Sequence, residues 1–247
     1  MSFAVLVYSL VCVFLAAIVR GYSGFGFSLL VITALSLALT PAQIVPSIFL
    51  LEIAASLHLL PTIWRDIHWR SLLPLIVGCL IATPFGVRLL ATIPAPPMQV
   101  ALAVFVIGTT FLLWHGFALK RIPGAAGSIG VGAVSGLCNG AFGIGGPPVI
   151  LLYLSTPAGH AVGRASLITF FLATDMIGLV LLAREGLVTW DAFARAAIFI
   201  IPLILGVWLG ARSFKTADPM MFRKLVLILL TLLAVLTAAK GAYTLLS

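Results

Sequence analysis

The sequence predicts an all-α integral membrane protein, and its composition is the first observation that predicts it. Of 247 residues, 62% are hydrophobic and only 8% are charged, and the mean hydropathy is +1.26. Because soluble domains carry about 25% charged residues, this apolar surface requires lipid to cover it. The net charge of +8 then indicates basic cytoplasmic loops rather than a nucleic-acid partner.

Ten apolar segments are the second observation. They cover residues 3–19, 25–39, 43–60, 71–91, 97–117, 124–138, 144–155, 161–182, 191–211 and 221–245. A full membrane span needs about 20 residues, so the second, sixth and seventh segments are short. We expect these three to be half-helices or parts of re-entrant hairpins, which are tolerated where their backbone lines a cavity or is buried in protein.

Two glycine-rich interruptions are the third observation. The first spans Arg20 to Leu30 and the second spans Cys138 to Ile150. Both contain a Phe-Gly step, at Phe25 and at Phe142, and these two residues stand 117 positions apart. Broken segments at matching places in the two halves of a membrane chain are the best sequence indication of a transporter's binding site.

The two halves match elsewhere as well. Residues 1–117 are interpreted as the first transmembrane repeat, 118–123 as a basic linker, and 124–247 as the second repeat. Gly86-Val87-Arg88 in the first half corresponds to Gly210-Ala211-Arg212 in the second. Because each half holds five segments, an odd number, we expect inverted repeats with glycine-broken or re-entrant helices at the midplane.

The basic residues predict the orientation. With the N-terminus outside and every segment crossing, ten of the 14 basic residues fall on the inner side: Arg20, Arg65, Arg70, Lys120, Arg121, Arg164, Arg212, Lys215, Arg223 and Lys224. The outer side receives Arg88, Arg184, Arg195 and Lys240. This bias agrees with the positive-inside rule and puts both termini of a multi-pass protein on the outer side.

The glycine runs favour the binding of an anion. Glycines leave successive backbone N–H groups unshielded, and such groups form anion-binding concavities. A helix that starts near Gly146, with Pro147 in its first turn, would direct its positive end toward that concavity. The candidate substrate-binding residues are Arg20, Gly24, Phe25, Gly26, Ser28, Asn139, Gly140, Phe142, Gly143, Gly145, Gly146 and Pro147. The alternative is that these glycines serve close helix packing.

Three polar side chains in these runs each have two interpretations. Arg20 is an anion anchor if its run dips into the membrane, and a positive-inside marker if the segment spans fully. Asn139 either donates to an oxyanion or caps a helix. Ser28 either donates to the ligand or bonds back to its own helix.

Two carboxyl groups lie within apolar segments, where ionisable residues indicate function by default. Glu52 and Asp175 are each candidates to carry a coupling proton, or else structural partners of an arginine on another helix. Arg164 opens the eighth segment, either as an interfacial anchor or as a gate on the cytoplasmic side.

Enzymatic motifs are absent from the sequence. It contains no GxxxxGK[ST] loop and no HExxH motif, and its three cysteines show no metal-binding spacing. We therefore expect no cofactor, no metal and no enzyme, since an intramembrane enzyme would need a clustered catalytic constellation. The paired broken segments also argue against a purely structural subunit.

These residues resemble the TauE/SafE family of sulfite exporter-like permeases over essentially the whole chain. The resemblance rests on Arg20-Gly21-x-x-Gly24-Phe25-Gly26-Phe27, on Asn139-Gly140-x-Phe142-Gly143-Ile144-Gly145-Gly146-Pro147-Pro148, and on Arg164-Ala165-Ser166-Leu167. It implies export or uptake of small sulfur-containing or organic anions across the bacterial inner membrane.

The sequence as a whole thus predicts a secondary transporter. Its substrate would be a small anion such as sulfite, a sulfonate or a carboxylate, moved by alternating access, with a proton or sodium as the candidate coupling ion. The partners expected are the lipid bilayer and, as a candidate assembly, further copies of the chain. A passive anion channel of the same architecture stays open as the alternative, and dependence of the flux on protons or sodium would separate the two.

Overall fold

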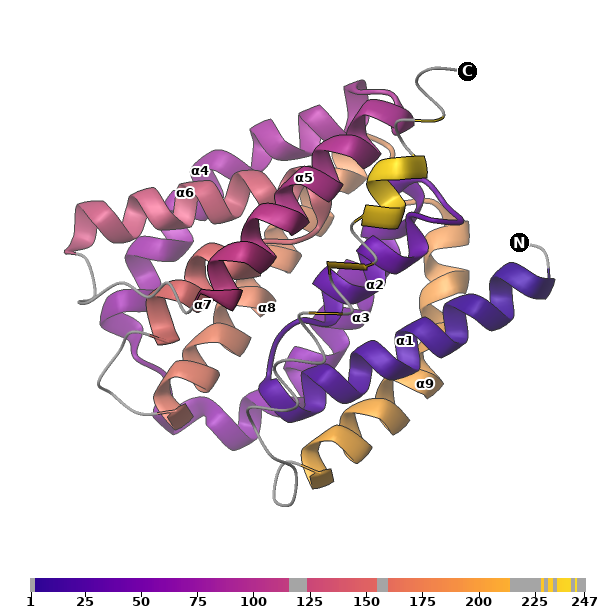
Figure 1. The fold of residues 1–247 in the computed structure, drawn as a ribbon. Helices are drawn as coiled ribbons and strands as arrows, with labels where there is room; N and C mark the ends of the chain where they lie inside the picture. The colour runs from indigo at the N-terminus through magenta and orange to yellow at the C-terminus, as the bar shows by residue number, and fades with distance from the viewer. Residues whose placement is uncertain are drawn as a thin grey trace.

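In the part of Phe3–Ser213 that the structure describes, nine α-helices and one short 3₁₀ helix follow one another (Figure 1). The computed structural model describes residues 3–115, 124–154 and 160–213, together with residues 228, 231–232, 235–240 and 243. The helices are α1 (Phe3–Ser23), α2 (Phe27–Leu35), α3 (Pro41–Ile63), η1 (Trp64–Asp66), α4 (Trp69–Thr92), α5 (Ala95–Trp114), α6 (Ala125–Phe142), α7 (Gly146–Leu154), α8 (His160–Arg184) and α9 (Trp190–Ser213). The linker 118–123 and most of the tenth segment lie outside the described residues.

Within the described residues, seven helices are long and apolar enough to cross a membrane, namely α1, α3, α4, α5, α6, α8 and α9. The short second and seventh segments are confirmed, since α2 and α7 have nine residues each. The expectation of a short sixth segment is wrong, because α6 has 18 residues and continues to Phe142. Gly140 does not end this helix; its bare Cα instead packs against the backbone of α4.

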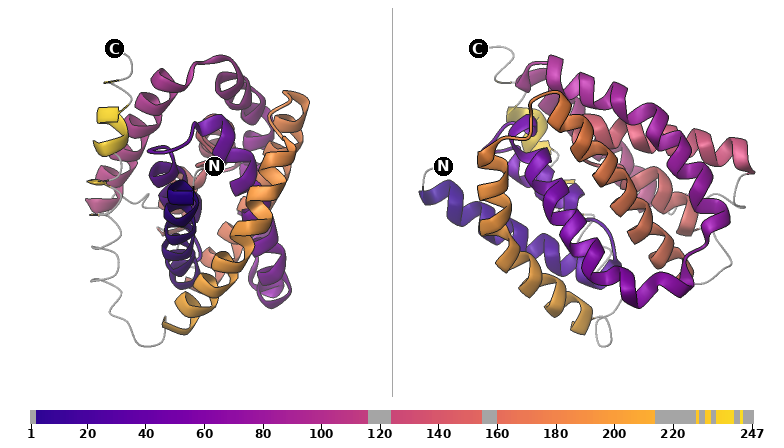
Figure 2. Two further views of the ribbon diagram at one scale, coloured as in Figure 1. Left: turned by 90° about the vertical axis from the view of Figure 1, so that its right-hand side faces the viewer. Right: turned by 180° about the vertical axis from the view of Figure 1, so that it is seen from behind.

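Two pairs of helices approach each other backbone to backbone at glycines. Gly140 of α6 faces the Thr83 carbonyl of α4, and Gly21 of α1 faces the Val207 carbonyl of α9. A Cβ atom at either glycine would come within 3.0 Å of the facing backbone. The α1–α9 and α4–α6 pairs lie on opposite sides of the molecule (Figures 1 and 2), and α3 packs against α8 between them. Small residues allow this close approach of membrane helices.

The start of α3 is defined by local sequence. Thr40 and Gln43 form a capping box in which the Gln43 side chain accepts the Thr40 N–H at 3.1 Å. Pro41 occupies the first turn, where its missing N–H leaves no hydrogen bond unmade. Arg195 of α9 donates to the Gln43 carbonyl at 2.8 Å, which ties the two halves together at this end.

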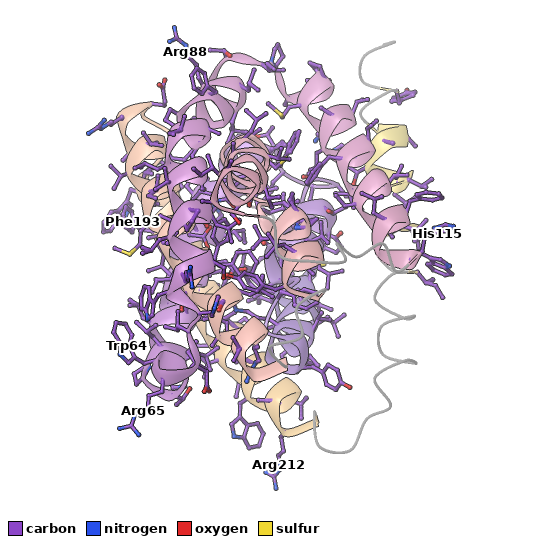
Figure 3. All side chains as sticks on the ribbon, turned by 90° about the vertical axis from the view of Figure 1, so that its left-hand side faces the viewer. Trp64, Arg65, Arg88, His115, Phe193 and Arg212 are labelled. Carbon is purple, nitrogen blue, oxygen red and sulfur yellow. The ribbon has the colours of Figure 1, made fainter. Side chains whose placement is uncertain are left out.

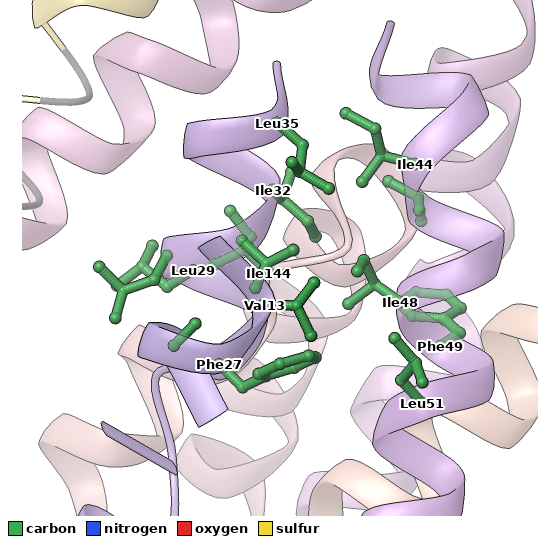
Figure 4. Packing of buried hydrophobic residues seen from close by; sticks show 14 of the residues in the cluster. Val13, Phe27, Leu29, Ile32, Leu35, Ile44, Ile48, Phe49, Leu51 and Ile144 are labelled. Atoms are coloured by element: carbon green, nitrogen blue, oxygen red, sulfur yellow. The ribbon is translucent and has the colours of Figure 1, made fainter. Parts of the chain in front are cut away.

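Among the described residues the hydrophobic core has two clusters, and each receives a residue from one of the two glycine-rich turns. Ile144, between α6 and α7, is buried with Ile32, Ile48 and other residues of α2 and α3 (Figure 4). Phe25, between α1 and α2, packs against a cluster formed mainly by α4, α7 and α8. Ile144 therefore packs with helices of the first half, and Phe25 joins a cluster to which both halves contribute.

The outer faces of the bundle carry exposed apolar side chains such as Phe85, Ile201 and Leu205, as expected of a surface that lipid covers. Figure 3 shows Arg88 at one end of the molecule and Arg65 and Arg212 at the other. The topology derived from charge also puts Arg88 on the side opposite Arg65 and Arg212.

Candidate functional site

The two helix breaks are built alike. α1 ends where Gly24 adopts a φ of 81° and donates its N–H to the Arg20 carbonyl at 2.7 Å. α6 ends where Gly143 adopts a φ of 70° and donates to the Asn139 carbonyl at 2.8 Å. Glycine adopts this left-handed conformation without the steric cost that a side chain brings. After two further residues each turn leads into a nine-residue helix, α2 or α7.

This geometry corrects the alignment of the two halves. Gly24 corresponds to Gly143, 119 positions later, whereas matching the two Phe-Gly steps gave 117 positions. Phe25 lies in its turn, but Phe142 is the last residue of α6 and stacks on Phe105 with 5.4 Å between ring centroids. The match fails by two residues because the left-handed glycine, and not the phenylalanine, ends each helix. Under the corrected alignment Arg20 corresponds to Asn139.

The first half contributes a buried ion pair. Arg20, 1% exposed, is paired with Glu52 of α3 and donates from Nη2 to the Ser56 hydroxyl at 2.9 Å. Arg20 is therefore not a residue of an inner-side loop, because α1 continues past it to Ser23 and turns its side chain toward α3. Glu52 of α3 is thus paired with an arginine on another helix, α1.

The N-terminus of α2 already holds an anion, and that anion is Glu52. The backbone N–H and the hydroxyl of Ser28, in the first turn of α2, both hydrogen-bond to the Glu52 carboxylate. Unpaired N–H groups and the helix dipole favour a negative charge at this position. The partner of Ser28 in this structure is therefore a carboxylate of the protein itself.

The second half contributes a matching pair. Asn139, 2% exposed, donates from Nδ2 to Asp175 Oδ1 at 3.2 Å. Asn139 and Asp175 are separated by 36 positions, and so are Arg20 and Ser56. Asp175 is also close enough to interact electrostatically with both Glu52 and Arg20. The two pairs form one cluster, which we call the central polar cluster: Arg20, Glu52, Ser56, Asn139 and Asp175.

The central polar cluster holds two carboxyl groups and one guanidinium. Glu52 and Asp175 are 3% and 4% exposed. Burying a charge without a partner is costly, and a buried group that lacks one tends to neutralise. The cluster therefore holds one more carboxyl group than guanidinium groups.

The model of the family described as sulfite exporter TauE/SafE matches residues 9–237 of this chain. The chain belongs to the TauE/SafE family. A probable sulfite/organosulfonate exporter TauE of Cupriavidus necator is 28% identical over 211 residues, which cover 82% of this chain and 81% of that protein. No solved structure matches the chain. With seven apolar helices of sufficient length, this TauE/SafE family member is a multi-pass membrane transporter, and the family description is consistent with the expectation that it is not an enzyme.

Arg164 lies beside the central polar cluster of this family member and is half-buried. An added Cβ on Gly24 would meet the Arg164 Cγ at 2.9 Å and Nε at 3.2 Å, so the arginine side chain lies directly over that turn. Arg164 also interacts electrostatically with Arg20. Gly143, the counterpart of Gly24, is covered instead by Val45 and Ile32.

The remaining candidate residues occupy two kinds of position. Gly145 and Gly146 lie near the central polar cluster, because Gly145 approaches Asn139 and accepts a hydrogen bond from the Ser135 hydroxyl at its carbonyl, while Gly146 approaches Phe171. Pro147 follows in the first turn of α7. Gly26 is the N-cap of α2 and has a left-handed φ of 89°. Gly140 packs on the backbone of α4, so it serves the packing of helices in this structure.

Ser56 and Ser135 were missed from the sequence. Ser56 stands one helical turn after Glu52, so an i, i+4 search from Glu52 along the segment would have found it. Ser135 stands one turn before Asn139 in the same way. Neither residue is part of a glycine run, which is why a search limited to those runs passes over them.

Proposed function

We propose that this protein is a secondary transporter that moves a small sulfur-containing or organic anion across the membrane by alternating access. The observation that carries the proposal is the central polar cluster at the two helix breaks, where Arg20 and the N-terminus of α2 surround the Glu52 carboxylate. The printed name of the Cupriavidus necator relative, a probable sulfite/organosulfonate exporter, supports sulfite and sulfonates as the first substrates to test.

Inverted repeats are part of the proposal, and exchanged contacts between the halves support them. Gly21 of α1 approaches Val207 and Ala211 of α9, and Gly140 of α6 approaches Thr83 and Val87 of α4. Gly140 lies 119 positions after Gly21 in the sequence. Its contacts Thr83 and Val87 lie 124 positions before the contacts of Gly21, which are Val207 and Ala211. In Figure 1, α1 and α6 run in opposite directions. In inverted repeats, each half can adopt the conformation of the other. The two resulting conformations of the protein would open a central site first to one side of the membrane and then to the other.

Glu52 is proposed to be the coupling group. While it is charged, its carboxylate occupies Arg20 and the N–H groups of α2, and a substrate anion would compete with it. A proton on Glu52 would remove its charge and free both sites, so that the substrate oxyanion replaces the carboxylate. Asp175, next to Glu52, would hold the proton in the alternate state. Anion and proton would then move together in one cycle.

Substrate binding is tested by thermal unfolding in detergent with sulfite, sulfoacetate, taurine, thiosulfate, lactate and chloride. A ligand at about 100 times its Kd stabilises the folded state by about 2.7 kcal/mol. We expect one sulfur oxyanion to stabilise the protein and the effect to be lost in Asn139→Ala and Gly145→Leu. Gly130→Leu is the matched control, since a side chain there meets open space. If no anion stabilises the parent protein, the proposed function is wrong.

The carrier mechanism is tested in proteoliposomes. A carrier shows counterflow, in which internal unlabelled anion drives uptake of labelled anion, and an imposed pH gradient changes the uptake rate. A passive anion channel conducts without counterflow and responds only to voltage and concentration. Uptake driven by a sodium gradient and not by a pH gradient would keep the carrier but reject Glu52 as a proton site.

A further inference from the structure

We propose that Arg164 forms a second anion subsite, outside the central polar cluster, where the substrate first docks. The inference rests on the proposed function for the identity of the ligand, a small oxyanion with sulfite-like or sulfonate-like oxygens. It adds a residue and a cavity to that function. It also replaces Arg20 with Arg164 as the cation that first meets the substrate.

The charge of Arg20 is already compensated. Its guanidinium is paired with Glu52 and bonded to Ser56, and it is 1% exposed. An anion arriving from water would have to displace Glu52 before it could reach Arg20. Desolvating a substrate while breaking a buried ion pair is costly, so Arg20 is poorly suited to the first contact.

The charge of Arg164 is not compensated in the same way. Among the residues that the structure describes, the salt bridge present joins Arg20 to Glu52 and does not include Arg164. The buried Nε of Arg164 has no hydrogen-bond partner. The charged neighbour that acts on Arg164 is Arg20, which has the same sign. A buried donor without a partner and a repelled positive charge are both relieved by a bound anion.

A cavity of about 90 Å³ is lined by Arg164 together with Gly21, Tyr22 and Ala211. About 10–15 Å³ of such volume is enough for one water molecule, so the cavity has room for a small oxyanion. Gly21 and Ala211 add no bulk there, and Tyr22 brings a phenol group. The cavity combines residues of α1, α8 and α9, and therefore lies between the two halves.

The position of the cavity fits a docking role. Ala211 is exposed and precedes Arg212, which Figure 3 places at the end of the molecule opposite Arg88. Under the topology predicted from charge, this end faces the cytoplasm. Arg164 lies over Gly24, four residues after Arg20. An anion held at Arg164 would thus be one helical turn from the central polar cluster.

The first test measures the electrostatic field in the cavity with thiol reagents. Ala211→Cys introduces an accessible thiol, and its rates of reaction with a negatively charged and a positively charged methanethiosulfonate are compared. The parent protein, with cysteines at 12, 79 and 138, measures the background. We expect Arg164→Gln to lower the anionic-to-cationic rate ratio by about fivefold or more, because Arg164 and Ala211 line the same cavity and a unit charge acts strongly on a charged reagent inside it.

Two controls isolate Arg164. Arg212→Gln removes a nearby charge whose guanidinium lies 5.4 Å from the centre of the Trp208 ring, and Arg195→Gln removes a charge bonded to α3. Both are expected to change the ratio less than Arg164→Gln does. An equal effect of Arg212→Gln would overturn the assignment, because it would show a general surface potential.

The second test asks whether an anion occupies the cavity. Methanesulfonate should protect the introduced thiol from both reagents in the parent background, and protection should need at least tenfold more ligand in Arg164→Gln. Arg164→Lys should restore part of the protection by methanesulfonate, since lysine keeps the positive charge but lacks the guanidinium geometry. No protection at any concentration would overturn the subsite.

The outcomes also separate this inference from the proposed function. If proteoliposomes transport anions while Arg164→Gln changes neither the rate ratio nor the protection, the transporter stands and the subsite is wrong. If protection depends on Arg164 but no transport is measured, the subsite stands and the proposed function is wrong.

Discussion

Asn139 donates a hydrogen bond to Asp175 across 36 positions, and Arg20 donates to Ser56 across the same 36 positions. Shifting the first pair back by 119 positions gives the second pair. The two halves of the chain thus share a pattern of buried polar contacts in which the residue types differ. One half holds a cation, and the other holds a neutral amide that faces a carboxyl group. This asymmetry gives the central polar cluster its excess of carboxyl groups.

The Arg20–Glu52 pair predicts a strong and non-additive effect on stability. Arg20→Leu should lower the free energy of unfolding by about 3–5 kcal/mol, because it leaves Glu52 buried without its cation. The double variant Arg20→Leu/Glu52→Leu should lose clearly less, since no charge is then left unpaired. Thermal unfolding in one detergent compares four proteins, namely the parent, Arg20→Leu, Glu52→Leu and the double variant. Additive losses would show that the two side chains do not depend on each other.

The turn at Gly24 predicts an effect on anion binding that goes beyond backbone strain. Gly24→Ala should cost about 1–2 kcal/mol for its left-handed conformation, and its Cβ would also displace Arg164. Gly186 is the matched control, because it has a φ of 71° and its Cβ would meet nothing within 4 Å. Both variants should lose similar stability, whereas only Gly24→Ala should lose the anion-dependent thermal shift. A normal shift in Gly24→Ala would contradict this role for the glycine.

The contact between α4 and α6 predicts where bulk is tolerated. Gly86→Val should destabilise the protein by at least about 2 kcal/mol, because its side chain would overlap the Leu137 carbonyl of α6. Gly108→Val on α5 should be nearly neutral, since that position faces open space. Melting temperatures at matched expression test the difference. Equal destabilisation would mean that α4 and α6 can separate at little cost.

The excess carboxyl group predicts a variant in which transport and proton movement are uncoupled. Asp175→Asn leaves one carboxylate and one guanidinium in the central polar cluster, which are balanced without a bound proton. We expect the proton flux that accompanies each transported anion to fall by at least tenfold, while counterflow of the anion continues. A pH-sensitive dye inside proteoliposomes reads the proton flux. Ser56→Ala, which removes only a hydroxyl, should keep the coupling; a loss of coupling there would argue for a general structural effect.

Much of the fold could be predicted from sequence because it depends on local properties. That α2 and α7 are short followed from the lengths of the apolar segments 25–39 and 144–155, which fall below a full membrane span. The error in α6 arose because glycine at a break and glycine at a helix interface look the same along the chain. Only a facing backbone, here that of α4, tells Gly140 from Gly143.

The sequence predicted which residues belong to the candidate site, but not which of these residues contact one another. Arg20, Glu52, Asn139 and Asp175 stood out because ionisable and amide groups are rare in apolar segments. That Glu52 would fill the N-terminus of α2 depends on how α3 packs beside that helix. Likewise, Arg164 became a candidate for the first contact only once Arg20 was found paired.

The sequence by itself determined that this protein lies in a membrane, that two glycine-rich runs interrupt its apolar segments, and which family it resembles. Hydropathy and local composition depend on a few neighbouring residues, so a linear chain is enough to show them. The tertiary structure decided which charges are compensated and which face a cavity. Both depend on contacts between side chains of helices that are far apart in the sequence. Which side chains make these contacts is set by the packing of the whole helix bundle.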